Sequence, residues 1–175
     1  ARALAITGLI DDDLTKQAKW ELFEHMKGGR PTIETIGNLR SIFEPWVGDP
    51  EKIAPSGIEG TPESLLQAFR LENVVRTETT GALTAGRVSV ADAAGEYSQG
   101  WEISAILDER TTPVCLAADG LKFRKEDGAA IRLQPALHWQ CRSVLMFITL
   151  DDLPVEWSSE EEINKVLELI PAGFK

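Results

Sequence analysis

The stretch WEISAIL, residues 101–107, marks the change from helical to strand periodicity in this chain of 175 residues. Four apolar residues, Trp101, Ile103, Ala105 and Leu107, take every second position, and two polar residues, Glu102 and Ser104, lie between them. Successive side chains of a strand point to opposite faces, so this alternation predicts a strand with one face in a core. The sequence before the stretch has helical spacing and the sequence after it contains further strand patterns. The stretch therefore separates a helical part from a sheet.

Two helices with defined ends are predicted in residues 1–60. Asp11 to Asp13 supply a cap and favourable negative charge at the start of the first helix, which Gly28 ends. Thr32 is the expected cap of the second helix, which Pro45 ends. The residues with core spacing are Leu14, Ala18, Leu22, Phe23 and Met26 in the first helix and Ile33, Ile36, Leu39 and Phe43 in the second. We interpret residues 1–60 as a helical lead-in.

A long central helix is predicted from Thr61, its cap, to about Ala94, with Gly81 and Gly86 as points where it could break. At 100° per residue, Arg76 falls on one line with three apolar residues, Leu65, Phe69 and Leu83. A guanidinium in an apolar stripe is costly unless it is paired. We therefore expect Arg76 to be buried and bonded to a carboxylate.

Two carboxylates are the first candidates for that partner. Glu72 lies one turn earlier on the same helix face as Arg76, and Asp108 follows the alternating strand.

The rest of the chain predicts a small sheet and a terminal helix. The segments LKF (121–123) and IRL (131–133) flank Asp127 and Gly128, which favour a hairpin turn. The run SVLMFITL (143–150) is apolar on both faces and is predicted to be a central strand. Ser159 and Glu162 have capping-box spacing at the start of a last helix.

The predicted fold class is therefore α+β: N-terminal helices, a long central helix, a small and mostly antiparallel sheet, and a C-terminal helix. The predicted division is a lead-in at 1–60, a core at 61–150 and a C-terminal helical extension at 151–175.

Composition and charge limit the function. The net charge of -10 disfavours electrostatic wrapping of nucleic acid, so contact with DNA is not indicated by charge. We identify no apolar run of membrane-spanning length, and the chain has too few cysteines, two, for a disulfide framework. It begins without Met, so we expect the natural polypeptide to have a further N-terminal part.

Cys115, His138 and Cys141 form the main candidate for chemistry, and four readings are open. They could bind zinc, with Asp108 or Asp119 as a fourth ligand, although the chain lacks a Cys-x-x-Cys pair. Cys115 could be a nucleophile with His138 as its base, or the two cysteines could form a disulfide. We favour a structural role with reduced thiols, and we expect the three residues to meet because they flank the predicted hairpin.

Four motifs in order resemble the phage head-morphogenesis family, the Mu F-like minor head proteins, in their C-terminal domain. The segments are RLENVVRTETTGALTAGR, GWEISAILDERTTPVCLAADGLKF and PALHWQCRS. The matching residues are Arg76, Thr77 and Glu78; Asp108, Arg110 and Thr111; Cys115, Asp119 and Gly120; and Pro135, His138, Cys141 and Arg142. Thr112 and Ser143 stand where many relatives have cysteine, and Ala136 replaces a second proline.

The resemblance implies a structural, non-enzymatic virion component that associates with portal and capsid proteins during head morphogenesis, with a role in DNA packaging or ejection in some members. Its place would be the head interior or portal vertex, after assembly in the host cytoplasm. The residues that we expect to form a structural polar clamp are Arg76, Glu78, Asp108, Arg110, Cys115, Asp119, His138, Cys141 and Arg142. The alternative function is a metal-assisted or thiol hydrolase that uses Cys115 and His138.

Overall fold

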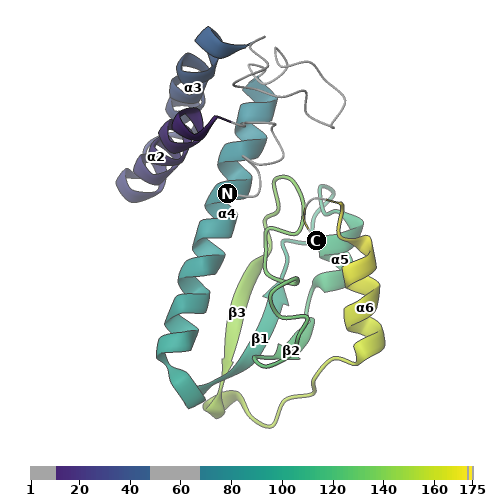
Figure 1. The fold of residues 1–175 in the computed structure, drawn as a ribbon. Helices are drawn as coiled ribbons and strands as arrows, with labels where there is room; N and C mark the ends of the chain where they lie inside the picture. The colour runs from purple at the N-terminus through teal and green to yellow at the C-terminus, as the bar shows by residue number, and fades with distance from the viewer. Residues whose placement is uncertain (1–10, 48–67, 173, 175) are drawn as a thin grey trace. The chain divides into compact units, whose positions relative to one another are not determined.

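Helices and a small antiparallel sheet make up the structure, and the predicted α+β class is confirmed (Figure 1). The computed structural model describes residues 11–47, 68–172 and 174, so the predicted cap Thr61 and Leu65 lie outside the described residues. Two compact units, Ala1–Thr79 and Thr80–Lys175, are distinguished, and their boundary falls within the sequence of helix α4 (Ala68–Ala93).

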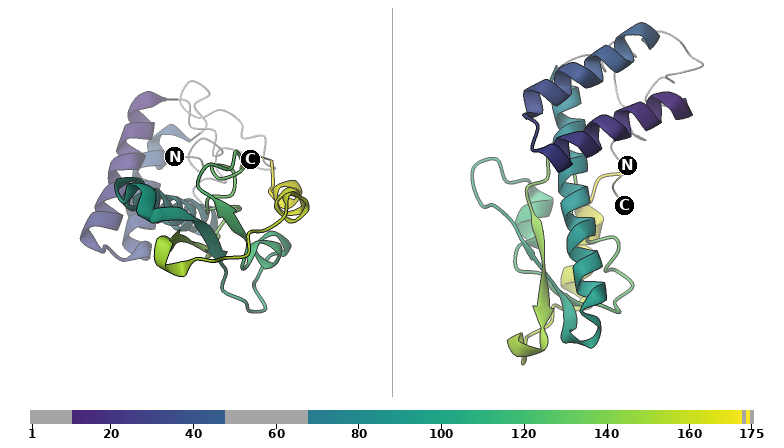
Figure 2. Two further views of the ribbon diagram at one scale, coloured as in Figure 1. Left: turned by 90° about the horizontal axis from the view of Figure 1, so that it is seen from below. Right: turned by 90° about the vertical axis from the view of Figure 1, so that its left-hand side faces the viewer.

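In the first unit, α2 (Asp12–Gly28) and α3 (Thr32–Phe43) pack side by side and are followed by the short helix η1 (Glu44–Trp46) (Figure 2). The predicted cap of α2 is confirmed, because Asp11 Oδ1 accepts the backbone N–H of Leu14 at 2.9 Å. Gly29 ends the helix in a left-handed conformation with φ of 63°. The buried residues of the helix pair are Leu14, Ala18 and Leu22 from α2 and Thr35, Ile36, Leu39 and Phe43 from α3.

The predictions for four residues of these helices are wrong. Phe23, Met26 and Ile33 have 46%, 39% and 74% of their surface exposed, because the buried stripe of each helix is narrower than the apolar pattern. Thr32 is the first residue of α3 and not its cap. The cap position belongs to Pro31, whose carbonyl oxygen accepts the first backbone hydrogen bonds of the helix.

The helix α4 runs without interruption through Gly81 and Gly86. The predicted burial of Arg76 is wrong: its side chain is 53% exposed. Its partner is one of the two expected, because Arg76 Nε donates to Glu72 Oε1 at 2.6 Å on the same helix. The buried residues of this part of α4 are instead Leu71, Val74, Val75 and Thr77. The helix therefore avoids the cost of removing the guanidinium from water.

In the second unit, β1 (Ser98–Ser104) is the central strand of a three-stranded antiparallel sheet in the order β2-β1-β3. The 3-10 helix η3 (Gly95–Tyr97) joins α4 to β1. Trp101 and Ile103 are buried, as the alternation predicts, whereas Leu107 lies beyond the end of the strand and is 57% exposed. Figure 1 shows β1 between β3 and β2.

The predicted hairpin and the predicted centre of the sheet are both wrong. After β2 (Lys122–Arg124), residues 128–133 form turns in place of a second strand, and β2 pairs with β1. Asp127 still makes a turn, because its carboxylate accepts the N–H of Arg124 at 2.8 Å. The strand β3 (Val144–Thr149) lies at an edge, with Leu145 and Ile148 buried and Phe147 partly exposed.

Two helices pack against each other beside the sheet, α5 (Pro113–Ala118) and α6 (Glu160–Leu169). The helix α5 was not predicted from the sequence, although Thr112 caps it and Pro113 is its first residue. The predicted capping box of α6 is confirmed, with reciprocal hydrogen bonds between Ser159 and Glu162.

The segment before α6 covers the outer edge of β2. This segment, residues 153–159, follows the 3-10 helix η4 (Leu150–Asp152). Ser158 N donates to the carbonyl of Lys122 at 2.9 Å, and Lys122 N donates to Ser158 Oγ at 3.0 Å. The ring of Trp157 lies under the guanidinium of Arg124 at 4.6 Å and against Gly100 of β1. These contacts protect an edge that would otherwise expose unpaired backbone groups.

Candidate functional site

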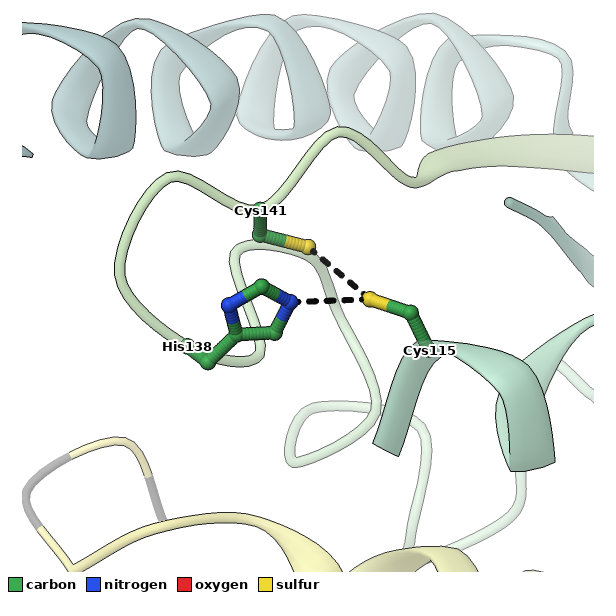
Figure 3. Close-up of side chains that lie close together, drawn as sticks. All are labelled: Cys115, His138 and Cys141. Carbon is green, nitrogen blue, oxygen red and sulfur yellow. Dashed lines mark hydrogen bonds between the residues drawn. The ribbon is translucent and has the colours of Figure 1, made fainter. Parts of the chain in front are cut away.

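Cys115, His138 and Cys141 lie together in the second unit, as predicted (Figure 3). Cys115 belongs to α5, and the other two residues belong to the loop of residues 135–143 that leads into β3. Their possible ligand atoms all lie within 4.8 Å of one another. The reason given for their proximity is wrong, because helix α5 and the turn of the loop bring them together and the hairpin does not exist.

Local structure places Cys115 on the inner side of α5. Thr112 Oγ1 accepts the N–H of Cys115 at 3.5 Å, so the cysteine is in the first turn of the helix. Val114, Cys115 and Ala118 are buried. The small apolar face of α5 therefore carries the thiol into the core.

Two features shape the loop that carries His138 and Cys141. Cys141 N donates to the carbonyl of His138 at 3.3 Å, and Gln140 between them has a left-handed backbone with φ of 56°. Thr80 Oγ1 on α4 donates to the carbonyl of Cys141 at 2.8 Å. The loop of residues 135–143 is therefore held by its own turn and by a hydrogen bond from α4.

The polar atoms of the cluster make close contacts. Cys115 Sγ lies 2.9 Å from His138 Nε2 and 3.8 Å from Cys141 Sγ. Ser143 Oγ donates to Cys115 Sγ at 3.1 Å, and Thr112 Oγ1 lies 3.0 Å from His138 Nε2. The cluster thus joins three ligand-type side chains with two hydroxyl groups.

The orientation of the imidazole is fixed by its second nitrogen. His138 Nδ1 lies 2.7 Å from the carbonyl oxygen of Trp139, which can only accept a hydrogen bond. Nδ1 therefore carries a proton, and in the neutral ring the lone pair of Nε2 faces the two thiols.

The cysteines ionise as a pair. The hydrogen bond from Cys115, with backbone hydrogen bonds at Leu137 and Ser143, lowers the pKa of Cys141. The same contact with Cys141, together with burial, raises the pKa of Cys115. Burial is the largest single influence on His138 and opposes its charged form, but the interactions with Cys141 and with the Trp139 carbonyl together raise the pKa of His138. The cluster therefore favours one thiolate beside a basic imidazole, and such a group can bind a soft cation.

An ion pair lies beside the cluster. Arg142 Nη1 and Nη2 donate to the two carboxylate oxygens of Asp108 at 2.7 and 2.6 Å. This bond is the main reason why the pKa of Asp108 lies well below its usual range. Asp108 Oδ1 also accepts the backbone N–H of Arg110 at 2.9 Å, while the Arg110 side chain is exposed. The ion pair therefore links the loop after β1 to the loop before β3.

Seven of the nine predicted clamp residues belong to the second unit. Asp119 Oδ1 accepts the backbone N–H of Ala105 at 2.7 Å, so it ties α5 to the end of β1. Asp108 and Asp119, the two predicted fourth ligands, are thus both engaged elsewhere. Arg76 and Glu78 belong to the first unit, where Arg76 pairs with Glu72.

The contacts of the Thr112 and Ser143 hydroxyls with the cluster were not predicted from the sequence. One signal for Thr112 was present, because the Thr-Pro pair at 112–113 is typical of a helix start.

Comparison with known proteins gives one match. A family model described as "Phage Mu protein F like protein" matches residues 16–146, from α2 into β3, and includes the cluster. No curated protein and no solved structure matches the chain. Within the described ranges, none of the helices combines the length and the apolar character needed to cross a membrane.

Proposed function

Because the chain belongs to the Phage Mu protein F like family, a family of phage head proteins, we propose that it acts as a structural protein in head morphogenesis. It associates with portal and capsid proteins while the head assembles in the host cytoplasm, and it stays in the head interior or at the portal vertex. A role in DNA packaging or ejection follows from that position.

The observation that carries this proposal is the extent of the family match. It covers residues 16–146, so it includes parts of both units and is not limited to one short motif. The net charge of -10 favours protein partners over DNA, because phosphate binding requires clustered basic side chains.

Polar side chains of the second unit support a structural role. The Arg142–Asp108 ion pair, the Asp119 bond to Ala105 and the Thr80 bond to Cys141 each tie one loop or element to another. Such bonds hold the loops of the second unit in one geometry, which favours binding to a partner protein.

The test uses heads purified from the phage that encodes the chain. Mass spectrometry of these heads should detect the protein in few copies, and cross-linking should join it to the portal or capsid protein. Deletion of the gene should reduce the yield of DNA-filled heads, and supply of the full chain from a plasmid should restore it. Heads that lack the protein, together with a normal yield of infectious particles after deletion, would refute the proposal.

A matched pair of variants tests whether head assembly requires the second unit to be stably folded. Leu133 is fully buried, whereas Ile131, two residues earlier, is 70% exposed. Leu133→Ala should destabilise the second unit by about 2–5 kcal/mol and lower the yield of filled heads. Ile131→Ala, the control, should preserve stability; if it also lowers the yield, Ile131 contacts a partner.

One observation favours the hydrolase alternative: Cys115 Sγ lies 2.9 Å from His138 Nε2, within reach of a general base. Against it, Cys115 and Cys141 are only 5% and 2% exposed, and a nucleophile must be reachable by its substrate. We expect slow alkylation of Cys115 at neutral pH. Rapid alkylation that slows strongly in His138→Ala would instead favour the enzyme.

A further inference from the structure

The cluster of Cys115, His138 and Cys141 has the ligand types and the spacing of a metal centre. We propose that these three residues bind one zinc ion, which fastens α5 to the loop of residues 135–143. This inference does not depend on the proposed head function, because it concerns the metal content of the isolated chain.

The distances between the ligand atoms are close to those of a tetrahedral site. Zn–S bonds of about 2.3 Å and Zn–N bonds of about 2.0 Å place two sulfurs about 3.8 Å apart and a sulfur and a nitrogen about 3.5 Å apart. The sulfurs of Cys115 and Cys141 are 3.8 Å apart. His138 Nε2 is 2.9 Å from Cys115 Sγ, and every pair in the cluster is within 4.8 Å. Zinc binding therefore requires Cys115 Sγ and His138 Nε2 to move apart by about 0.6 Å.

The groups around the cluster orient the ligands toward a common point. The bond between His138 Nδ1 and the carbonyl of Trp139 presents Nε2 to the thiols, which is the usual arrangement of a metal-binding histidine. Ser143 Oγ donates to Cys115 Sγ, and backbone hydrogen bonds at Leu137 and Ser143 support the sulfur of Cys141. These bonds hold the two sulfurs and Nε2 near one another, as a metal site requires.

Charge and burial favour a divalent soft cation. Both cysteine side chains are buried, and two buried thiolates without a counter-ion would be strongly unfavourable. A zinc ion neutralises both. Sulfur and imidazole ligands select zinc over magnesium or calcium, which prefer oxygen.

Three protein ligands leave one position of a tetrahedron. Asp108 is held by Arg142 through two bonds, and Asp119 is held by the backbone of Ala105. Among the described residues, the remaining candidates for the fourth ligand are the hydroxyls of Thr112, whose oxygen lies 3.0 Å from His138 Nε2, and of Ser143; otherwise a water molecule takes this position.

The site would act on the sheet through the loop. Residues 135–143 lead directly into β3, which begins at Val144 and pairs with β1 as an edge strand. A zinc ion that joins this loop to α5 fixes the position from which β3 starts. Removal of the metal should therefore lower the melting temperature of the chain.

The experiment uses the full chain, without a metal-binding tag, purified with a non-chelating reductant. Elemental analysis should find about one zinc ion per chain that survives dialysis. Replacement by Co²⁺ should give the intense thiolate-to-cobalt charge-transfer absorption of a site with cysteine ligands. Chelation should lower the melting temperature, and zinc should restore it.

Matched variants locate the site. His138→Ala, Cys115→Ser and Cys141→Ser should each lose most of the bound zinc. The control is His25→Ala, the other histidine of the chain, which contacts Thr35 in the first unit and should keep its zinc. Equal loss of zinc in His25→Ala and His138→Ala would overturn the assignment.

Wild-type protein decides the case if the variants fail to fold. Metal-free wild-type chain, shown to be folded by circular dichroism, is titrated with zinc while its two thiols react with a disulfide reagent. Saturation at about one equivalent and at least a tenfold slower thiol reaction would support the site. A folded protein with unchanged thiol reactivity under excess zinc, or a native Cys115–Cys141 disulfide in the intact mass, would overturn it.

Discussion

The substitution Gly100→Ala tests how the C-terminal segment is packed on the sheet. Gly100 lies in the central strand β1, opposite Arg124 of β2. A Cβ atom at this position would lie 2.5 Å from the carbonyl oxygen of Phe123 and 2.6 and 2.8 Å from two carbons of the Trp157 ring. Ordinary contacts between carbon atoms are about 3.5–4.0 Å, so the methyl group requires shifts of about 1 Å.

Two effects of opposite sign set the magnitude. Overpacking of a well-packed site costs about 1–3 kcal/mol. Alanine recovers about 0.5–1 kcal/mol relative to glycine in a strand, because it restricts the unfolded chain more. The carbonyl of Phe123 is part of the β2 backbone and cannot move alone, so the cost of the clash prevails. We expect a net loss of about 1–2 kcal/mol in the free energy of unfolding.

Urea unfolding followed by circular dichroism measures this loss. The control is Gly81→Ala in α4, where an added Cβ meets no atom within 4 Å and should stabilise the helix by up to about 1 kcal/mol. Combining Gly100→Ala with Trp157→Ala should reduce the penalty of the first substitution, because the ring contacts are then gone. A Gly100→Ala midpoint equal to or above that of wild type, with Gly81→Ala behaving as expected, would refute the close approach of the Phe123 carbonyl and the Trp157 ring to Gly100.

Three further predictions concern single side chains. Arg76→Ala should change stability by no more than about 0.5 kcal/mol, because the side chain is 53% exposed; a loss of several kcal/mol in urea unfolding would contradict this. Ser159→Ala should cost about 1 kcal/mol through loss of the α6 cap, and an unchanged melting temperature would argue against the capping box. Arg142 lowers the pKa of Asp108 in the folded chain. The Asp108 carboxylate should therefore stabilise the fold fully above its unfolded pKa of about 4. This stabilisation should be lost as the pH falls through the lower pKa of the folded state. The stability difference between wild type and Asp108→Asn should accordingly be smaller at about pH 3 than at about pH 7, and an equal difference at both would contradict the ion pair.

The starts of two helices, α2 and α6, and the buried face of the central strand were determined by the sequence itself. Asp11 caps α2, and Ser159 with Glu162 caps α6, because a cap depends on residues within one turn of each other. The alternation around Trp101 and Ile103 correctly indicated which side of β1 is buried.

The candidate cluster was partly determined in the same way. Cys115, His138 and Cys141 were identifiable by residue type, since the chain has two cysteines and two histidines. Their separation of 2.9 to 4.8 Å depends on α5 and on the turn at Gln140. The helix α5 was not predicted because its 6 residues are too few to show a helical period of apolar positions.

Only the tertiary structure decided the strand order and the environment of Arg76. Periodicity states which side of an element is apolar, but it does not state what lies opposite that side. The apolar run of β3 therefore suggested a central strand, although β1 takes that place. The alignment of Arg76 with apolar residues on the helix likewise suggested that Arg76 is buried. The buried residues of this part of α4 are instead Leu71, Val74, Val75 and Thr77. Neighbours are chosen by contacts between residues far apart in the chain, and a local pattern carries no information about them.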